Sequence, residues 1–358
     1  MTEIDQRRRA LAARLPELKI DALLVSAPAN VRYLTGFAGS NAILLVTRSE
    51  AHFFTDPRYA LEATRQITCK VHIEKKPLLL GANALIKRKR LKKIGFESSS
   101  LRYDDYIKVK EEVPMGSAMH PVGRIIEEQR MVKSASEMSL IRRSVATNSE
   151  AYSKTIRRVH AGAREMDIAA ELDYQMRALG AEKAAFETIV AAGPRTALPH
   201  AHPTGHRLGE NELLLIDMGA TQEGYASDMT RVAHTGTPSK RIAKLYKAVL
   251  EAQLAAIASV KAGVTTGVVD AAARNVLKRH ELDRAFVHST GHGLGLEIHE
   301  PPRIARKDKT KLQAGMAITI EPGAYIDGLG GIRIEDTVLV TEHGCEVLTP
   351  TPKDFIEL

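Results

Sequence analysis

The sequence contains few aromatic residues and few cysteines. Its 358 residues include no tryptophan, and aromatics make up 4%, so it lacks the aromatic platforms on which single-stranded nucleic acids stack. Its two cysteines, Cys69 and Cys345, lie far apart and outside any CxxC pattern. This spacing argues against a disulfide framework and against a zinc site built from thiolates. We therefore expect both thiols to be reduced, as in a cytoplasmic protein.

Long apolar runs are also missing. The longest, such as LLVSAPA and LLLIDM, are far shorter than the ~20 residues of a membrane-spanning helix. The N-terminal segment MTEIDQRRRALAARLPELKI carries charges and no uninterrupted apolar stretch, so it does not read as a signal peptide. These features predict a cytoplasmic protein that has no membrane partner.

The net charge is +8, and most of the excess lies in the first third of the chain. Much of it is one basic run that starts at Lys87 and ends at Lys93. Such a run could bind nucleic acid, but no aromatic residue interrupts it and the apolar segment IGF follows directly. We interpret it as a solvated helix end, where cations complement the helix dipole. We expect no nucleic-acid partner.

The length predicts two domains, and a content of 44% hydrophobic and 26% charged residues is typical of globular proteins. In the first third, patterns typical of helices and strands alternate, which predicts an α/β domain. Ser134 and Glu137 form a capping box ahead of a long helical pattern that runs to about residue 160. We therefore expect an N-terminal domain over residues 1–129 and a second domain over residues 130–358.

The second domain shows a different pattern. Helical periodicity covers residues 167–179, 240–260 and 268–280. Strand patterns cover residues 213–220, 227–233, 317–321 and 331–340. Because short glycine-containing loops join these strands, we expect antiparallel pairing and an α+β fold.

Acidic residues interrupt several of these strands. Asp217 lies in the apolar run LLLIDMGA, where an unpaired carboxylate would be costly to bury, and Asp228 lies in YASDMTRVA. A turn centred on residues 222–223 would place the two carboxylates opposite each other, ~4.5–5.5 Å apart at their Cβ atoms. Taken alone, a strand aspartate is more often part of a turn or a salt bridge. Two like charges held this close would need a cation between them.

A similar arrangement recurs near the C-terminus, where a loop centred on Gly328 would bring Glu321 opposite Glu335. Between the two acid pairs lies HSTGHGLGLEIHE, with His288, His292 and His299. Its glycines could suggest phosphate binding, but the lysine of a P-loop is missing. Four acids and an imidazole suit two divalent ions ~3.5–4 Å apart, and oxygen-rich ligation favours Mn²⁺, Co²⁺ or Zn²⁺.

Residues 130–358 resemble the pita-bread metallopeptidases, which comprise methionine aminopeptidases, Xaa-Pro aminopeptidases and Xaa-Pro dipeptidases (prolidases). The resemblance rests on motifs in unbroken order: AAGPRTALPHA, LLLIDMGA, GYASDMTR, HSTGHGLGLEIHEPP, TIEPGAY and GGIRIEDTVLVTEHG. It implies an α+β fold, with a C-terminal pita-bread catalytic domain whose curved antiparallel sheet has helices packed outside. One departure is Arg195, which stands where the commonest form of the family has asparagine.

The resemblance also implies roles for individual residues. The implied metal ligands are Asp217, Asp228, His292, Glu321 and Glu335, with Asp228 and Glu335 as the bridging or bidentate members. The implied catalytic residues are Glu321, His200 and His299, and the implied substrate-binding residues are His200, His288, His299 and Arg333. The implied cofactors are two divalent metal ions, with Mn²⁺ as the first choice and Co²⁺ or Zn²⁺ as alternatives.

The segments VRYLTGFAGSNAILLV and TDPRYALEA resemble the smaller, creatinase-like α/β N-terminal domain of the proline-specific branch. Methionine aminopeptidases usually lack this domain, and creatinase lacks the metal ligands. The resemblance therefore implies a homodimeric Xaa-Pro aminopeptidase that cleaves peptides with proline at the second position. The first alternative is an Xaa-Pro dipeptidase, which shares every motif above. A more remote alternative is a catalytically inactive pita-bread binding module.

Overall fold

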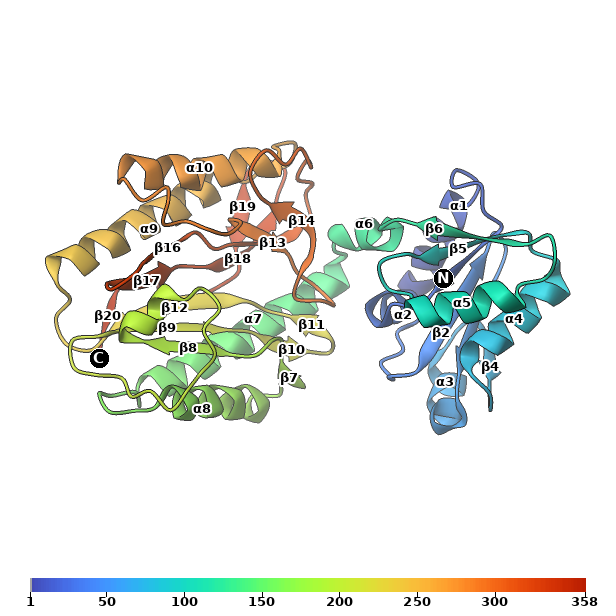
Figure 1. The fold of residues 1–358 in the computed structure, drawn as a ribbon, viewed down its shortest axis with the longest axis horizontal. Coiled ribbons are helices and arrows are strands. Elements are labelled where there is room, and N and C mark those ends of the chain that lie inside the picture. The colour runs from blue at the N-terminus through green and yellow to red at the C-terminus, as the bar shows by residue number, and fades with distance from the viewer. Residues whose placement is uncertain (1) are drawn as a thin grey trace. The chain divides into compact units, whose positions relative to one another are not determined.

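The computed structural model describes residues 2–358, which divide into two compact units. The first unit ends at Arg130 and the second is Met131–Leu358 (Figure 1). Within the described residues, none of the helices is both long enough and apolar enough to cross a lipid bilayer.

The first unit is built on a six-stranded sheet with the strand order β4-β3-β2-β1-β5-β6. Strands β1, β2 and β3 pair antiparallel, whereas β4, β5 and β6 run parallel to their neighbours. The elements in chain order are α1 (Glu3–Arg14), β1 (Ala22–Val25), α2 (Pro28–Thr35), β2 (Ala42–Thr47), β3 (Ala51–Thr55), α3 (Ala60–Gln66), β4 (Lys70–Ile73), α4 (Leu78–Lys89), β5 (Lys93–Glu97), α5 (Tyr103–Glu112), β6 (Ala118–Val122) and α6 (Ile125–Met131).

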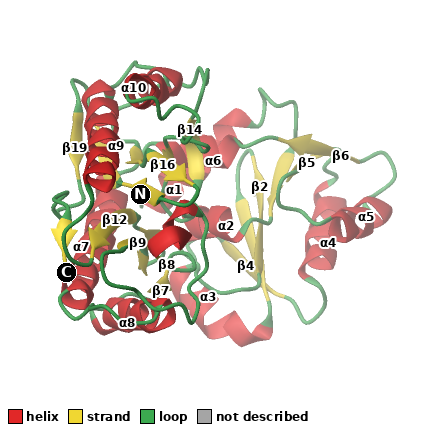
Figure 2. Ribbon diagram, turned by 60° about the vertical axis from the view of Figure 1, so that its left-hand side comes forward, coloured by secondary structure: helices red, strands yellow, loops and turns green. Residues whose placement is uncertain are grey.

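Helices flank both faces of this sheet (Figure 2). Leu24, Leu45 and Phe54 share one face because side chains alternate along a strand, and they pack against Leu85 and its neighbours in α4. The last turn of α4 carries the first part of the basic run, the helix ends in a left-handed cap at Arg90, and the last residue of the run, Lys93, begins β5. The first half of the run is therefore a helix end, as the sequence predicts, and the second half leads into β5.

The second unit combines long helices with four antiparallel or mixed sheets. Its longest helix begins with the expected capping box of Ser134 and Glu137. The elements are α7 (Ala135–Ile156), α8 (Glu165–Ala178), β7 (Lys183–Ala184), β8 (Ile189–Ala192), β9 (Leu213–Met218), β10 (Ala220–Gln222), β11 (Tyr225–Ala226), β12 (Met229–His234), α9 (Lys240–Ser259), α10 (Thr266–Arg279), β13 (Gly291–Gly293), β14 (Glu300–Ile304), β15 (Ala317–Ile320), β16 (Gly323–Ile326), β17 (Gly330–Arg333), β18 (Asp336–Val340), β19 (Cys345–Val347) and β20 (Ile356–Glu357).

Strand β9 lies inside a four-stranded sheet with the order β20-β12-β9-β8, and both of its faces are buried. Leu214 and Ile216 pack with α7 and α8, whereas Leu213 and Leu215 pack with α9, α10 and strands β15 to β18. The alternation of side chains then puts Asp217 on the same face as Leu213 and Leu215. The apolar pattern of β9 thus carries a carboxylate into the interior of the second unit.

Three of the four acids lie where a strand is interrupted. Asp228 lies between β11 and β12, Glu321 follows β15, and Glu335 lies between β17 and β18. The sequence predicts uninterrupted strands over residues 227–233 and 331–340, and the structure breaks the second of these at residues 334–335. Each of these three acids stands next to the end of a strand, where acids from different strands can converge.

The register of the first acid hairpin differs from the sequence prediction. Asp217 pairs with Thr230, not with Asp228, because the turn is centred on Glu223 and Gly224 instead of residues 222–223. Both turn residues have positive φ, 48° and 85°, which suits a two-residue hairpin turn. Since the register is off by two residues and the side-chain period is two, the expected face of each acid is unchanged.

The register of the second acid hairpin is confirmed. Ile320 pairs with Asp336 at the end of the β15–β18 ladder, and Gly323 pairs with Arg333 at the start of the β16–β17 ladder. Glu321 and Glu335 lie between these two ladders, in the same register. Four acids from two separate hairpins are thus available to one site in the second unit.

Candidate metal centre

Carboxylates from both hairpins meet around His292. One carboxylate oxygen each from Asp228 and Glu335 and one imidazole nitrogen of His292 all lie within 4.8 Å of one another. His292 Nε2 lies 3.5 Å from Asp228 Oδ2 and 3.5 Å from Glu321 Oε1. The spacing of these atoms matches a set of ligands that share a cation between them.

The local sequence fixes which nitrogen of His292 faces the acids. Gly291 and Gly293 flank it in β13, and a Cβ on either would lie within 2.3 Å of a backbone oxygen of a neighbouring segment. His292 Nδ1 donates a hydrogen bond of 3.0 Å to the Gly293 carbonyl. Burial lowers the pKa of His292 to about 4, so the ring is neutral at pH 7 and its Nε2 lone pair points at carboxylate oxygens. This is the ligating state of a histidine.

Burial dominates the electrostatics of the acids. It raises the pKa of Glu321 to about 8, and it raises the pKa values of Asp228 and Glu335 well above their ordinary values. Repulsion among the neighbouring carboxylates adds to the increase in each case, and Arg333 opposes it. The protein alone therefore holds too little positive charge to stabilise these three carboxylates in their ionised form.

Two of the carboxylate oxygens are buried without compensation. Asp217 Oδ1 and Glu335 Oε1 are shielded from solvent and have no hydrogen-bond partner among the described residues. An unpaired buried oxygen of an ionised carboxylate is strongly unfavourable. Oxygen-rich donors with a single imidazole suit a divalent cation such as Mn²⁺, Co²⁺ or Zn²⁺, so the residues present fit the metal ions that the sequence implies.

Arg333 is the cationic partner of this cluster, and only 3% of its surface is exposed. Its Nη2 donates to Asp217 Oδ2 at 2.6 Å, and its Nε donates to Thr230 Oγ1 at 3.0 Å. Its Nη1 donates to the carbonyl of Pro199 at 3.2 Å. Thr230 in turn donates to Glu335 Oε2 at 2.7 Å. One guanidinium thus orients a carboxylate from each acid hairpin.

A chain of hydrogen bonds links Arg333 to His288. Arg333 Nη1 also donates to Tyr325 Oη at 2.6 Å, and the hydroxyl of Tyr325 lies 2.9 Å from His288 Nε2. His288 Nδ1 lies 2.8 Å from the carbonyl of Ser289, to which it donates. Burial lowers the pKa of His288 to about 4, so its Nε2 accepts the proton of Tyr325. Both nitrogens of His288 are therefore engaged within the protein.

The other two histidines of the predicted site are more exposed. The ring of His299 lies edge-on to that of His292, with ring centroids 4.4 Å apart. His200 is exposed and lies near enough to His288 and His299 that its charge would lower the pKa of each of them. The structure thus brings together all nine predicted site residues, with His200 and His299 on the solvent side.

Two residues that hold this site together are missing from the sequence prediction. Tyr325, which is half-buried, and Thr230, which is buried, make the contacts with Arg333 described above. Tyr325 lies in the motif TIEPGAY, four residues after Glu321, and this position in the motif could have identified it as a site residue. Thr230 would have emerged from the correct register, which places it opposite Asp217.

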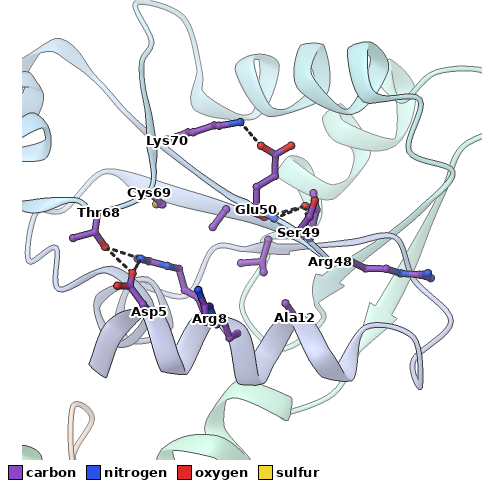
Figure 3. Close-up of a pocket in the computed structure, with 13 residues that line it drawn as sticks. Asp5, Arg8, Ala12, Arg48, Ser49, Glu50, Thr68, Cys69 and Lys70 are labelled. Atoms are coloured by element: carbon purple, nitrogen blue, oxygen red, sulfur yellow. Dashed lines mark hydrogen bonds and ion pairs between the residues drawn. The ribbon is translucent and has the colours of Figure 1, made fainter. Parts of the chain in front are cut away.

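The first unit contains a separate hollow of about 390 Å³, lined by α1, the turn between β2 and β3, and the start of β4 (Figure 3). In it, Arg8 contacts Asp5 and donates to Thr68 Oγ1 at 2.6 Å. Lys70 contacts Glu50 across the hollow. These charged groups already compensate one another, in contrast to the acids of the second unit.

Comparison with known proteins adds an independent line of support. An Xaa-Pro dipeptidase from Pyrococcus horikoshii is 35% identical over 99% of this chain and 100% of its own length. The solved structure of an Xaa-Pro dipeptidase from Bacillus anthracis is 34% identical and covers 99% of this chain and 100% of its own, with a TM-score of 0.97. The structure of an X-Pro aminopeptidase from Thermotoga maritima is also 34% identical, covering 96% of this chain and 100% of its own, with a TM-score of 0.89.

The sequence pattern of metallopeptidase family M24 matches residues 139–342, and that of the creatinase/prolidase N-terminal domain matches residues 7–132. The family resemblance and the α+β fold class inferred from the motifs are thereby confirmed. The chain is a metallopeptidase that belongs to family M24, in the proline-specific branch that carries a creatinase-like N-terminal domain.

Proposed function

We propose that the protein is an Xaa-Pro dipeptidase that hydrolyses the bond before proline in dipeptides. The observation that carries this proposal is the buried acid cluster around the neutral His292, in which carboxylate oxygens lack partners among the described residues. The sequence alone favours an Xaa-Pro aminopeptidase and keeps the dipeptidase as its alternative. Two full-length relatives, from Pyrococcus horikoshii and Pyrococcus furiosus, are named Xaa-Pro dipeptidases, so the comparisons support the alternative better.

Five residues would hold two divalent metal ions. They are Asp217, Asp228, His292, Glu321 and Glu335, with Asp228 and Glu335 shared between the ions. When bound, the ions activate a water molecule for attack and polarise the carbonyl of the scissile bond. The grouping of Asp228 and Glu335 with His292 within 4.8 Å supports their role as ligands, and the shared role itself follows from the family resemblance.

Glu321 would accept the proton of the attacking water and pass it to the proline nitrogen. An Xaa-Pro bond is a tertiary amide without an N–H, so its nitrogen must gain a proton as it leaves. The position of Glu321 supports this role, because its Oε1 lies 3.5 Å from His292 Nε2, beside the other ligand atoms where the attacking water would be held.

The histidines and Arg333 would serve the substrate in different ways. His200 and His299 would donate hydrogen bonds to the oxyanion and the peptide backbone, and their place on the solvent side supports contact with a bound peptide. His288 and Arg333 would support the substrate site indirectly, because both form hydrogen bonds with the hydroxyl of Tyr325. We assign to them the orientation of Asp217 and of the proline-side pocket.

The remaining properties follow from the resemblance and the composition. We propose Mn²⁺ as the native ion, since oxygen ligands predominate, and Co²⁺ or Zn²⁺ as substitutes. We propose a homodimer, on the resemblance to the proline-specific branch. The two free cysteines, Cys69 and Cys345, support a reducing, cytoplasmic location.

A substrate panel tests the proposed function. Ala-Pro, Ala-Pro-Ala, Ala-Ala-Ala and Met-Ala-Ala are supplied at matched concentration to protein loaded with Mn²⁺, Co²⁺ or Zn²⁺. We expect rapid cleavage of Ala-Pro and little cleavage of the others. If Ala-Pro-Ala is cleaved and Ala-Pro is not, the protein is an aminopeptidase, and equal cleavage of Ala-Ala-Ala would remove the proline assignment.

A further inference from the structure

The segment that carries His200 has little secondary structure of its own. After β8 ends at Ala192, it contains a single 3₁₀ helix, Gly193–Ala197, and then runs irregularly until β9 begins at Leu213. His200 is exposed in the middle of this stretch. Its position must therefore come from contacts that the segment makes with the rest of the second unit.

Glu165, the first residue of α8, provides several of these contacts. Its side chain is fully buried, and it accepts hydrogen bonds from both ends of the segment. At the start, it accepts from Ala192 N at 2.9 Å and from Arg195 Nε at 2.9 Å. At the end, it accepts from Thr204 N at 2.9 Å and from Thr204 Oγ1 at 2.7 Å. One buried carboxylate thus closes the segment into a loop.

Arg195 extends this closure toward His200. While its Nε donates to Glu165, its Nη2 donates to the carbonyl of His202 at 2.8 Å. On the other side of His200, the carbonyl of Pro199 accepts from Arg333 at 3.2 Å. His200 is therefore flanked by two anchored carbonyls, one held by Arg195 and one by Arg333 of the candidate metal centre.

We propose that Glu165 and Arg195 form a positioning pair that holds His200 toward the substrate. The inference deepens the proposed function and rests on it, because it concerns a histidine of the same site. A buried carboxylate is stable only when its oxygens are fully hydrogen-bonded, so Glu165 needs the ordered form of the segment. Arg195 alone joins that carboxylate to a backbone carbonyl two residues from His200.

A double-mutant cycle tests the proposal on the Mn²⁺-loaded protein. Arg195→Met should lower kcat/KM for Ala-Pro by about tenfold or more, since small displacements of a catalytic group are costly. In an His200→Ala background, Arg195→Met should change kcat/KM by less than about twofold, because the residue it positions is gone. Arg164→Met is the matched control, since its exposed pair with Asp167 lies one residue from Glu165, and it should leave kcat/KM unchanged.

Two further variants distinguish a loss of positioning from a general folding defect. Arg195→Lys keeps the charge but cannot donate to Glu165 and His202 in the fork geometry of a guanidinium, so it should recover part of the lost kcat/KM. Glu165→Gln should behave like Arg195→Met in the cycle. Equal effects of Arg195→Met with and without His200 would overturn the proposal, as would full recovery with a lysine that cannot make both bonds.

A spectroscopic measurement separates this proposal from the proposed function. In Zn²⁺-loaded protein labelled at histidine [¹³Cε1], the His200 resonance, assigned with His200→Ala, should shift and broaden in Arg195→Met and in Glu165→Gln. The His292 resonance should stay in place. If the wild-type protein cleaves no Xaa-Pro substrate, the proposed function fails, while this spectrum still decides the positioning role. An unchanged His200 resonance in both variants would overturn it.

Discussion

Replacing Glu321 with glutamine tests the electrostatic account of the carboxylate cluster. Glu321 is largely buried, and burial raises its pKa from 4.5 to about 8, with a further contribution from Asp217 and an opposing one from Arg333. Glutamine keeps the shape of the side chain but carries no charge at any pH. In protein depleted of metal, the variant should therefore become more stable relative to the wild type as the pH rises.

The sign follows from proton binding. A carboxyl group with a raised pKa binds its proton more tightly in the folded state, so its contribution to stability is complete below about pH 4.5 and is lost as the pH rises to about 8. An increase from 4.5 to about 8, at about 1.4 kcal/mol per pH unit, sets an upper limit of about 5 kcal/mol. Because Asp228 and Glu335 share in the proton binding, we expect about 2–3 kcal/mol for Glu321 itself.

The assay is urea unfolding followed by circular dichroism at pH 5, 6, 7 and 8, after chelation and dialysis. The free energy of unfolding of Glu321→Gln, minus that of the wild type, should increase over this range by the amount given above. Glu210→Gln is the matched control, because Glu210 is exposed in the same unit, and its difference from the wild type should not vary with pH. A difference between Glu321→Gln and the wild type that is constant from pH 5 to pH 8 would refute the account.

Further variants test the proposed ligands and their supports. Asp228→Asn and Glu335→Gln should each lower Mn²⁺ stoichiometry and activity together, and near-wild-type turnover at saturating metal would contradict their role as ligands; Asp104→Asn, in the first unit, should change neither. His299→Ala should retain its metal by elemental analysis and lose about 10²-fold in kcat/KM, whereas loss of metal would make it a ligand. Thr230→Val removes the hydroxyl that donates to Glu335 and should lower the free energy of unfolding at pH 7 by about 1–3 kcal/mol, as measured by urea denaturation.

The acid hairpins show how far sequence reasoning reaches. The register of Glu321 and Glu335 follows correctly from the position of Gly328, which has a positive φ of 71° and lies in the loop between β16 and β17. The sequence predicts Asp228 as the partner of Asp217, two residues away from the observed partner, Thr230. The turn is hard to locate because Glu223-Gly224 departs from the Asn-Gly and Asp-Gly pairs that usually mark such turns. The period of two along a strand preserved the faces, so the convergence of the acids was still predictable.

Contacts between segments that are distant in the sequence could not be predicted from the sequence alone. Glu165 reads as an ordinary acidic residue in the first turn of a helix, where the dipole favours it. Its burial and its bonds to Ala192 and Thr204 depend on how an irregular segment folds back. No periodicity marks that segment, and neither propensity nor spacing predicts which buried carboxylate will close it.

Arg333 contacts both a carboxylate of the acid cluster and the carbonyl that precedes His200. A cation bound among the acids would compensate part of the negative charge that Arg333 now compensates. A peptide bound against His200 would alter the hydrogen bond between Arg333 and the Pro199 carbonyl. If metal binding changes the affinity for a peptide through Arg333, peptide binding must change the affinity for the metal by the same factor.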